Sequence, residues 1–135
     1  MSEAGDLELI YLTIEDVVGL YAAIIGGTSS QASDQLRNRD GLEGAIGRLA
    51  AYAHYEAADL ATQAAVLAQG IAQSQSFLDG NKRLALVAML TFLEVNGYIV
   101  PVADRELAGW IIALSGELST EDLAGRIRRA MTPVR

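Results

Sequence analysis

The stretch FLDGNKR at residues 77–83 runs directly into the apolar segment LALVAMLTFL at residues 84–93. The apolar run predicts a helix, and the Asp-Gly-Asn turn predicts that this helix begins near Asn81. Lys82 and Arg83 then fall in the first turn, where the helix dipole disfavours each cation by about 0.3–1 kcal/mol. Lys82 is also the only lysine of the chain. Cations at this position indicate an anion that binds the start of the helix, and phosphate is the obvious candidate.

A helix that is apolar on every side needs other helices around it. Hydrophobic spacing and start signals predict such helices over residues 12–25, 40–53, 56–72 and 104–114, and a last helix capped by residues 119–122. Thr13 is the expected N-cap of the first helix, and Asp40 with Glu43 resembles a capping box for the second. The sequence therefore predicts an all-α bundle around a central apolar helix that spans about residues 81–95.

The segments between these helices carry turn and strand signals. Residues 28–38 are polar and rich in Ser and Gln, which predicts a loop, and a mobile one. The Gly26-Gly27 pair is expected to end the first helix, and Asn96-Gly97 to give the apolar helix a left-handed C-cap. Residues 98–102 are β-branched and short, and Pro101 restricts them to an edge strand or an extended link.

Composition limits the classes of protein to which the chain can belong. Its 135 residues are enough for one domain with its own core, and no internal repeat is present. The absence of cysteine excludes disulfides and thiolate metal sites, and a single histidine, His54, excludes a multi-histidine site. A net charge of −7 argues against nucleic-acid binding through bulk electrostatics. With no apparent signal peptide and no apolar run near the roughly 20 residues of a bilayer span, we expect a cytoplasmic protein without a membrane partner.

The residues of the turn have chemistry that suits a phosphate. Gly80 can adopt positive φ, and Asn81 can cap the helix and donate its amide. The N–H groups of Gly80, Asn81 and Lys82 can form an anion-binding nest, while Lys82 and Arg83 neutralise phosphoryl charge. Asp79 could hold Mg²⁺ or orient a nucleophile. Taken alone, these residues also fit an ordinary turn followed by two solvated cations.

The same residues resemble the signature of the Fic/Doc family. That signature reads His, any residue, Phe, any residue, Asp or Glu, Gly or Ala, and Asn, followed by Gly-Arg in typical Fic enzymes or Lys-Arg in the Doc (death-on-curing) branch. The Doc version is matched by Phe77, Asp79, Gly80, Asn81, Lys82 and Arg83. The similarity runs from about residue 12 to residue 129, so we expect a single Fic/Doc domain over residues 1–135. Phe77 is expected to pack inward and fix the turn.

This resemblance implies an all-α fold and a toxin from a bacterial toxin–antitoxin pair. Fic enzymes transfer AMP to hydroxyl side chains, whereas Doc-type toxins transfer the terminal phosphate of ATP to elongation factor Tu and stop translation. The Lys of the Doc motif is associated with a flipped nucleotide that offers its γ-phosphate. The resemblance thus implies ATP as substrate, phosphate binding by Asn81, Lys82 and Arg83, and a role for Asp79 with Mg²⁺ or the nucleophile.

One position departs from the family pattern in a way that affects catalysis. Gln75 stands where the family has the histidine that acts as general base. A neutral amide cannot take a proton near neutral pH, and loss of a general base costs roughly 10²–10⁴ in rate. Asp79 is the nearest alternative base, whereas His54 precedes a separate helix and is expected to be structural. Leu84 replaces a common Thr, with an effect expected on packing. We expect ATP binding to survive and turnover to be weak or absent.

Two other functions and one partner follow from the resemblance. The alternatives are a Fic-type AMP transferase and a catalytically dead module that retains nucleotide or antitoxin binding. The chain lacks the inhibitory spacing of Ser or Thr followed four residues later by Glu. Inhibition would then come from a separate Phd-like antitoxin that folds into a groove. The helix over residues 12–25 and the apolar side chains of residues 40–53 could wall that groove, or they could simply pack in the core.

Overall fold

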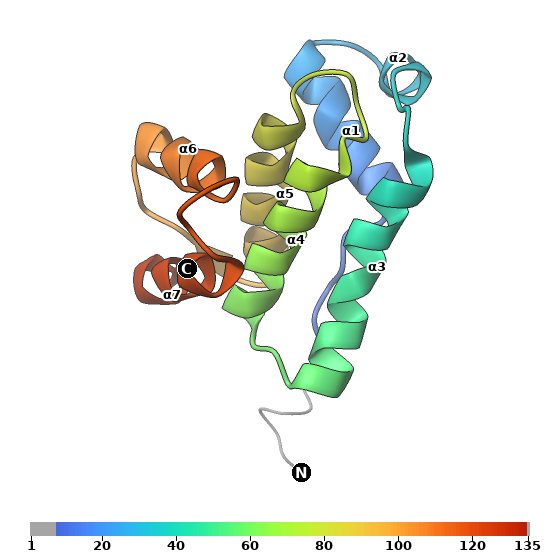
Figure 1. Ribbon diagram of the computed structural model, residues 1–135. Coiled ribbons are helices and arrows are strands. Elements are labelled where there is room, and N and C mark those ends of the chain that lie inside the picture. Colours follow the sequence, from blue (N-terminus) through green and yellow to red (C-terminus); the bar gives the residue numbers. More distant parts are fainter. Residues whose placement is uncertain (1–7, 135) are drawn as a thin grey trace.

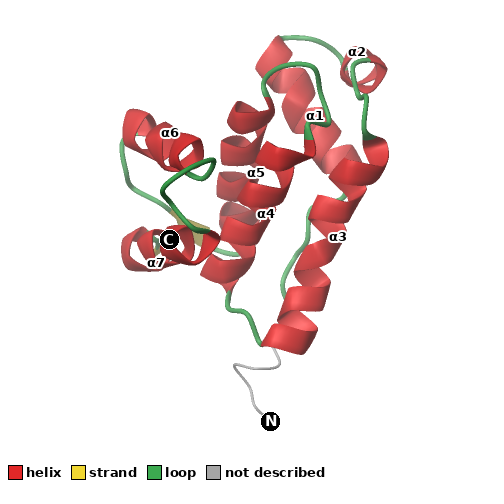
Figure 2. Cartoon of the chain, viewed as in Figure 1, coloured by secondary structure: helices red, strands yellow, loops and turns green. Residues whose placement is uncertain are grey.

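The computed structural model describes residues 8–134, which form seven helices and one two-stranded sheet (Figures 1 and 2). The helices, in chain order, are α1 (Ile14–Ile25), α2 (Ser29–Asp34), α3 (Arg39–Glu56), α4 (Leu60–Ser74), α5 (Asn81–Val95), α6 (Asp104–Ala113) and α7 (Thr120–Ala130). The strands β1 (Tyr98–Ile99) and β2 (Thr132–Pro133) pair antiparallel. The predicted all-α fold is confirmed.

Helices α4 and α5 pack against each other in the middle of the bundle (Figure 1). Helix α3 covers α4 on one side, α7 covers α4 and α6 covers α5 on the other, and α1 packs against α5 and α2. The apolar helix α5 begins and ends where the sequence predicts, at Asn81 and Val95. It shares the central position with α4, whose small side chains are buried along nearly its whole length because three helices approach it closely.

The segment over residues 28–38, predicted as a loop, contains the short helix α2. The Thr28 hydroxyl accepts a hydrogen bond from the Gln31 N–H, and the Gln31 side chain accepts one from the Thr28 N–H. Ala32 is fully buried, so this turn of helix packs onto the core rather than projecting from it. The loop prediction was wrong because a capping box and one buried methyl group stabilise a helix that composition alone does not indicate.

The boundary between α3 and α4 also differs from the prediction. Helix α3 is capped by Asn38, which accepts from the Gly41 N–H at 3.0 Å, so the predicted capping box of Asp40 and Glu43 does not form. The helix predicted over residues 56–72 begins only at Leu60. The chain reverses at Ala57, which has a left-handed backbone with φ of 53°, and Asp59 then caps α4.

Several other predicted helix ends are confirmed, whereas the helices predicted to end at residues 53 and 72 continue to Glu56 and Ser74. The Thr13 side chain forms a capping box with Asp16, Gly26 ends α1 with a left-handed φ of 67°, and Ser119 caps α7. After α5 the left-handed residue is Gly97, with φ of 94°. The predicted edge strand is β1, and its partner β2 lies close to the end of the described residues.

The apolar faces of α1 and α3 lie mainly in the core. Val17, Val18 and Tyr21 of α1 are buried, as are Leu42 and Leu49 of α3. Of the two predicted roles, walls of an antitoxin groove or packing in the core, these faces therefore adopt packing in the core. In the part of the chain that the structure describes, no helix combines the length and the hydropathy needed to cross a bilayer.

Gly70 allows α3 and α4 to approach closely, because a Cβ added there would lie 2.8 Å from the Ala45 Cβ. We expect Gly70→Ala to lower the free energy of unfolding by about 1–3 kcal/mol through overpacking, measured by urea denaturation. Gly47→Ala in α3 is the matched control, since a Cβ at Gly47 meets no atom within 4 Å. That control should gain about 0.4–1 kcal/mol from reduced chain entropy. Equal stabilisation by both variants would contradict the close approach.

Asp59 joins the start of α4 to α7. Its carboxylate accepts from the Thr62 N–H at 2.9 Å and from Arg128 Nε and Nη2 at 2.8 and 3.0 Å. The hydrogen bonds from Arg128 hold the pKa of Asp59 well below its usual range. Because the pKa is lowered on folding, the resulting stabilisation is complete above the unfolded pKa and is lost as the pH falls toward the folded one.

Asp59→Asn tests this link, because Asn is an equally good N-cap that lacks the charge. We expect the variant to be less stable than the wild type at pH 7 by up to about 1 kcal/mol, since the pair is half exposed. The difference should shrink as the pH falls below about 4. Urea denaturation at several pH values measures it, with Glu117→Gln, an exposed acid outside any ion pair of the described residues, as the control. A constant difference across this range would argue against the ion pair.

Candidate functional site

The turn between α4 and α5 is anchored by a buried aromatic pair. Phe77 is 2% exposed and its ring stacks on that of Tyr21 in α1, with centroids 3.7 Å apart and planes at 12°. The Tyr21 hydroxyl donates to the Asp79 carbonyl oxygen at 3.0 Å. The prediction that Phe77 packs inward is confirmed. As a result, α1 fixes both the side chain at the start of the turn and the backbone at its middle.

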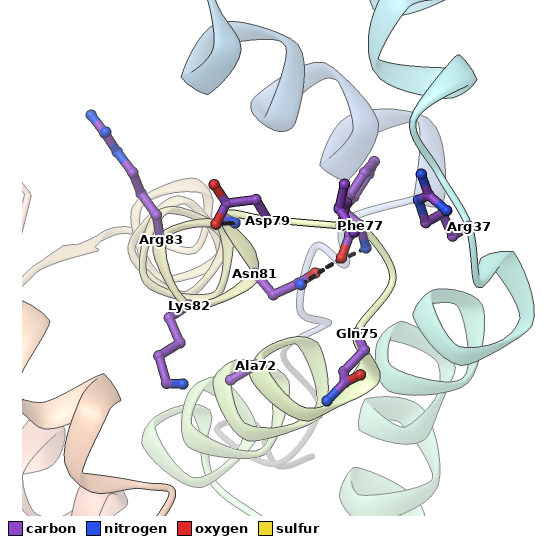
Figure 3. Close-up of a pocket in the computed structure, with 10 residues that line it drawn as sticks. Arg37, Ala72, Gln75, Phe77, Asp79, Asn81, Lys82 and Arg83 are labelled. Carbon is purple, nitrogen blue, oxygen red and sulfur yellow. Dashed lines mark hydrogen bonds between the residues drawn. The ribbon is translucent and has the colours of Figure 1, made fainter.

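Asn81 closes the turn from the other end. Its Oδ1 accepts from the Phe77 N–H at 3.0 Å, and its Nδ2 donates to the Phe77 carbonyl at 2.7 Å (Figure 3). The prediction that Asn81 caps the helix was wrong, because both polar atoms of its side chain are committed to Phe77. The N-cap is Gly80, whose φ of 83° confirms the expected left-handed backbone. A Cβ at Gly80 would also come within 3.4 Å of the Tyr21 ring.

The backbone N–H groups at the start of α5 are partly available to a ligand. The Gly80 N–H donates to Asp79 Oδ1 at 2.8 Å, so one member of the predicted nest already has an acceptor. No side chain of residues 8–134 caps the helix. The first amides of an α-helix have no acceptor within the helix, so those of Asn81, Lys82 and Arg83 remain as donors for an anion.

A cleft of about 540 Å³ lies over this turn. The sequence-predicted residues all line it, together with four others, and the full set is Arg37, Ala72, Gln75, Phe77, Leu78, Asp79, Gly80, Asn81, Lys82 and Arg83. Figure 3 shows Lys82 directed toward α4, whereas Arg83 extends from the other side of α5. Adjacent residues of an α-helix are about 100° apart, so the two cations serve different parts of the cleft.

Gln75 is the last residue before the turn and marks the end of α4. Its backbone is left-handed, with φ of 51°, one of two non-glycine residues in residues 8–134 with positive φ. This conformation costs a non-glycine residue roughly 1–2 kcal/mol, and such strain tends to occur at functional sites. The Gln75 side chain is exposed in the cleft and makes no hydrogen bond to any described residue. It is therefore free to contact a ligand.

His54 is remote from this cleft, as expected for a structural residue. Helix α3 starts beside the turn, where the Asn38 side chain donates to the Ser74 carbonyl at 3.0 Å. His54 lies fifteen residues after Arg39, the first residue of the helix, which places it about 22 Å further along the axis. Its exposed ring contacts Tyr55 edge-on instead.

Arg37 is a cleft residue that the sequence did not indicate. Its N–H donates to the Ser76 carbonyl at 2.7 Å, and the neighbouring Leu36 forms a β-bridge with Phe77. The short segment after α2 thus runs beside the segment that enters the turn. Arg37 lies in a polar stretch 40 residues before the motif, and nothing in the sequence indicates that it belongs to the same site. Only this backbone pairing brings it to the cleft.

The cleft gathers positive charge in an acidic protein. Arg37, Lys82 and Arg83 line it together with one carboxylate, Asp79, while the whole chain has a net charge of −7. Among residues 8–134, no carboxylate lies within 4.0 Å of any of these three cations. The cations are thus available to an anionic ligand, whose phosphates would also meet the free amides of α5.

The cleft also suits a magnesium ion that arrives with phosphates. Mg²⁺ commonly binds through one or two carboxylates plus substrate phosphates. The Asp79 carboxylate is exposed, and only its Oδ1 accepts a hydrogen bond, from the Gly80 N–H. The described residues contain no group of three or more acidic or histidine side chains that could hold a metal by themselves. Asp79 therefore fits a shared metal site rather than a site formed by protein ligands alone.

We expect Asn81→Asp to lower the free energy of unfolding by about 1–3 kcal/mol, because a carboxylate cannot donate to the Phe77 carbonyl. Urea denaturation measures this change. Lys82→Gln, one residue further along, is the control and should alter stability by no more than about 0.5 kcal/mol. Equal stability of the Asn81→Asp variant and the wild type would show that Asn81 does not hold the turn.

Comparison with known proteins agrees with the geometry. The model of the Fic/DOC family matches residues 11–93, which is more than half of the chain. The matched range covers α1 to the greater part of α5, including the turn and both walls of the cleft. A search of curated proteins gave no significant match.

Proposed function

The chain belongs to the Fic/DOC family, and we propose that it is a Doc-like phosphotransferase that uses ATP and acts on a protein hydroxyl. The observation that carries this proposal is the Lys82-Arg83 pair at the open N-terminus of α5, inside a cleft that Asp79 also lines. The Lys-Arg form of the motif is that of the Doc branch, which favours transfer of a phosphate over transfer of AMP.

The phosphates would be bound by backbone and side chains together. The amides of the first turn of α5 donate to phosphoryl oxygens, and Lys82 and Arg83 supply charge from two sides of the helix. Asn81 contributes indirectly, because its side chain holds Phe77 and leaves only its N–H for the ligand. Asp79 would hold Mg²⁺, which bridges phosphate oxygens and neutralises the charge that develops during transfer.

Gln75 sets the expected rate of the reaction. It lies at the edge of the cleft, where a general base would meet the acceptor hydroxyl, and its amide can hydrogen-bond that hydroxyl without removing its proton. Nucleotide binding depends on other residues and should persist. We therefore infer a protein that binds ATP well and transfers phosphate slowly.

Gln75 also favours a second candidate, a catalytically inactive nucleotide- or antitoxin-binding module. The two candidates differ in turnover but share the cleft. A Fic-type AMP transferase is the third outcome, and it is distinguished by the mass added to the acceptor, since AMP and phosphate differ in mass.

The biological role that fits this activity is that of a toxin inhibited by a Phd-like antitoxin, with elongation factor Tu as the acceptor protein. The resemblance to the Doc branch supports this role. The apolar faces of α1 and α3 are largely used in the core, so an antitoxin helix would have to contact the remaining exposed surface.

We expect Gln75→His to raise the rate of phosphate transfer from ATP to elongation factor Tu by roughly 10²–10⁴, because it restores a base that titrates near neutral pH. Intact-mass analysis of the acceptor gives both the rate and the transferred group. The affinity for ATP, measured by calorimetry, should change little. Gln73→His is the matched control, because it places the same side chain two residues away, outside the cleft.

Several outcomes would contradict the proposal. An equal transfer rate for the wild type and the Gln75→His variant would show that position 75 is not that of the general base. Addition of AMP would assign the chain to the AMP transferases. Absence of nucleotide binding in both proteins would exclude the phosphotransferase altogether.

A further inference from the structure

Arg37 brings a third cation to the cleft from a different part of the fold. Lys82 and Arg83 lie on α5, whereas Arg37 lies in the connection between α2 and α3. In Figure 3, Arg37 lies on the side of the turn opposite to Lys82 and Arg83. Three of the ten cations of an acidic chain therefore line one cleft, and they approach it from two sides.

The position of Arg37 is fixed relative to α5 by a chain of hydrogen bonds. The Arg37 N–H and the Asn38 N–H both donate to the Ser76 carbonyl, at 2.7 and 3.2 Å. Phe77, the next residue, is held by Asn81 at the start of α5. The backbone of Arg37 is thus held close to the start of α5, and no carboxylate of the described residues lies within 4.0 Å of its guanidinium.

We propose that Arg37 is a substrate-binding residue that contacts the part of a polyphosphate chain farthest from Lys82, and so selects nucleoside triphosphates over monophosphates. This inference rests on the proposed function. A single phosphate needs only the amides at the start of α5 and one nearby cation. A longer chain carries further anionic oxygens across the cleft, and a guanidinium on the opposite side can bind two of them at once.

An acidic segment of the acceptor protein is the other anion that could meet Arg37. The structure favours the nucleotide because Arg37 shares one cleft with Lys82 and Arg83 and its backbone is tied to the motif itself. The experiment below separates the two.

Calorimetry with ATP, AMP, inorganic phosphate and tripolyphosphate, on the full chain with Mg²⁺, tests the proposal. Arg37→Gln should weaken ATP and tripolyphosphate at least about tenfold, the loss expected for a charge-assisted hydrogen bond. AMP and inorganic phosphate should change less than about threefold. Lys82→Gln should weaken all four ligands. Arg105→Gln, an exposed arginine outside the cleft, is the control for net charge and should change none by more than threefold.

The outcomes distinguish failure of this inference from failure of the proposed function. If the wild type binds ATP and Arg37→Gln binds it equally well, Arg37 is not a polyphosphate ligand. A raised KM for the acceptor with unchanged nucleotide affinity would assign Arg37 to the acceptor and overturn the proposal. An effect on ATP without one on tripolyphosphate would place Arg37 at the nucleoside and would also overturn it. No binding by the wild type would instead contradict the proposed function. Thermal melting of each variant checks that the fold is intact.

Discussion

The turn between α4 and α5 depends on a buried contact, the stack of Phe77 on Tyr21, and on the two hydrogen bonds that Asn81 makes to the Phe77 backbone. The aromatic stack belongs to the apolar core and the hydrogen bonds belong to the polar turn, so Phe77 links the two. Because Phe77 is anchored inside the bundle, the residues after it must turn sharply into the start of α5, and Gly80 provides the left-handed backbone that this path requires. The first amides of α5 then face a cleft. A site built in this way has little freedom to move, which is what phosphoryl transfer requires of its binding residues.

The electrostatics of the cleft follow from the same arrangement. Lys82 and Arg83 occupy a helix position that disfavours cations, and neither has a carboxylate partner within the described residues. Arg37 joins them through backbone pairing with Ser76. An acidic chain that concentrates unpaired cations at one helix terminus has a surface suited to a polyanion. This local field differs in sign from the net charge, which explains why bulk composition gives no hint of the ligand.

Gln75 is the residue of this cleft that bears on catalysis rather than on ligand binding. Its strained backbone and exposed side chain lie where the resemblance puts the family histidine, and a neutral amide at that position offers no proton acceptor. His54 is too distant to replace it, whereas the exposed Asp79 carboxylate, of which one oxygen accepts from the Gly80 N–H, stays the nearest alternative base. Under the proposed function, this member of the Fic/DOC family would bind a nucleotide while its catalytic step lacks the usual base.

The sequence by itself determined the helical class, the limits of α5, the glycine at its start and the residues of the motif. These are local properties, because hydrophobic spacing, turn residues and positive φ act over a few neighbouring positions. It did not determine α2, the cap of α3 or the beginning of α4, where competing polar side chains, including Asn38 and Asp59, decide the boundary. Only the tertiary structure decided that Asn81 holds Phe77 rather than capping its helix, and that Arg37 reaches the cleft. Phe77 is held in place for Asn81 by its stack on Tyr21 of α1, and Arg37 is brought to the cleft by its pairing with Ser76. Both contacts join segments far apart in the sequence, and no local pattern encodes them.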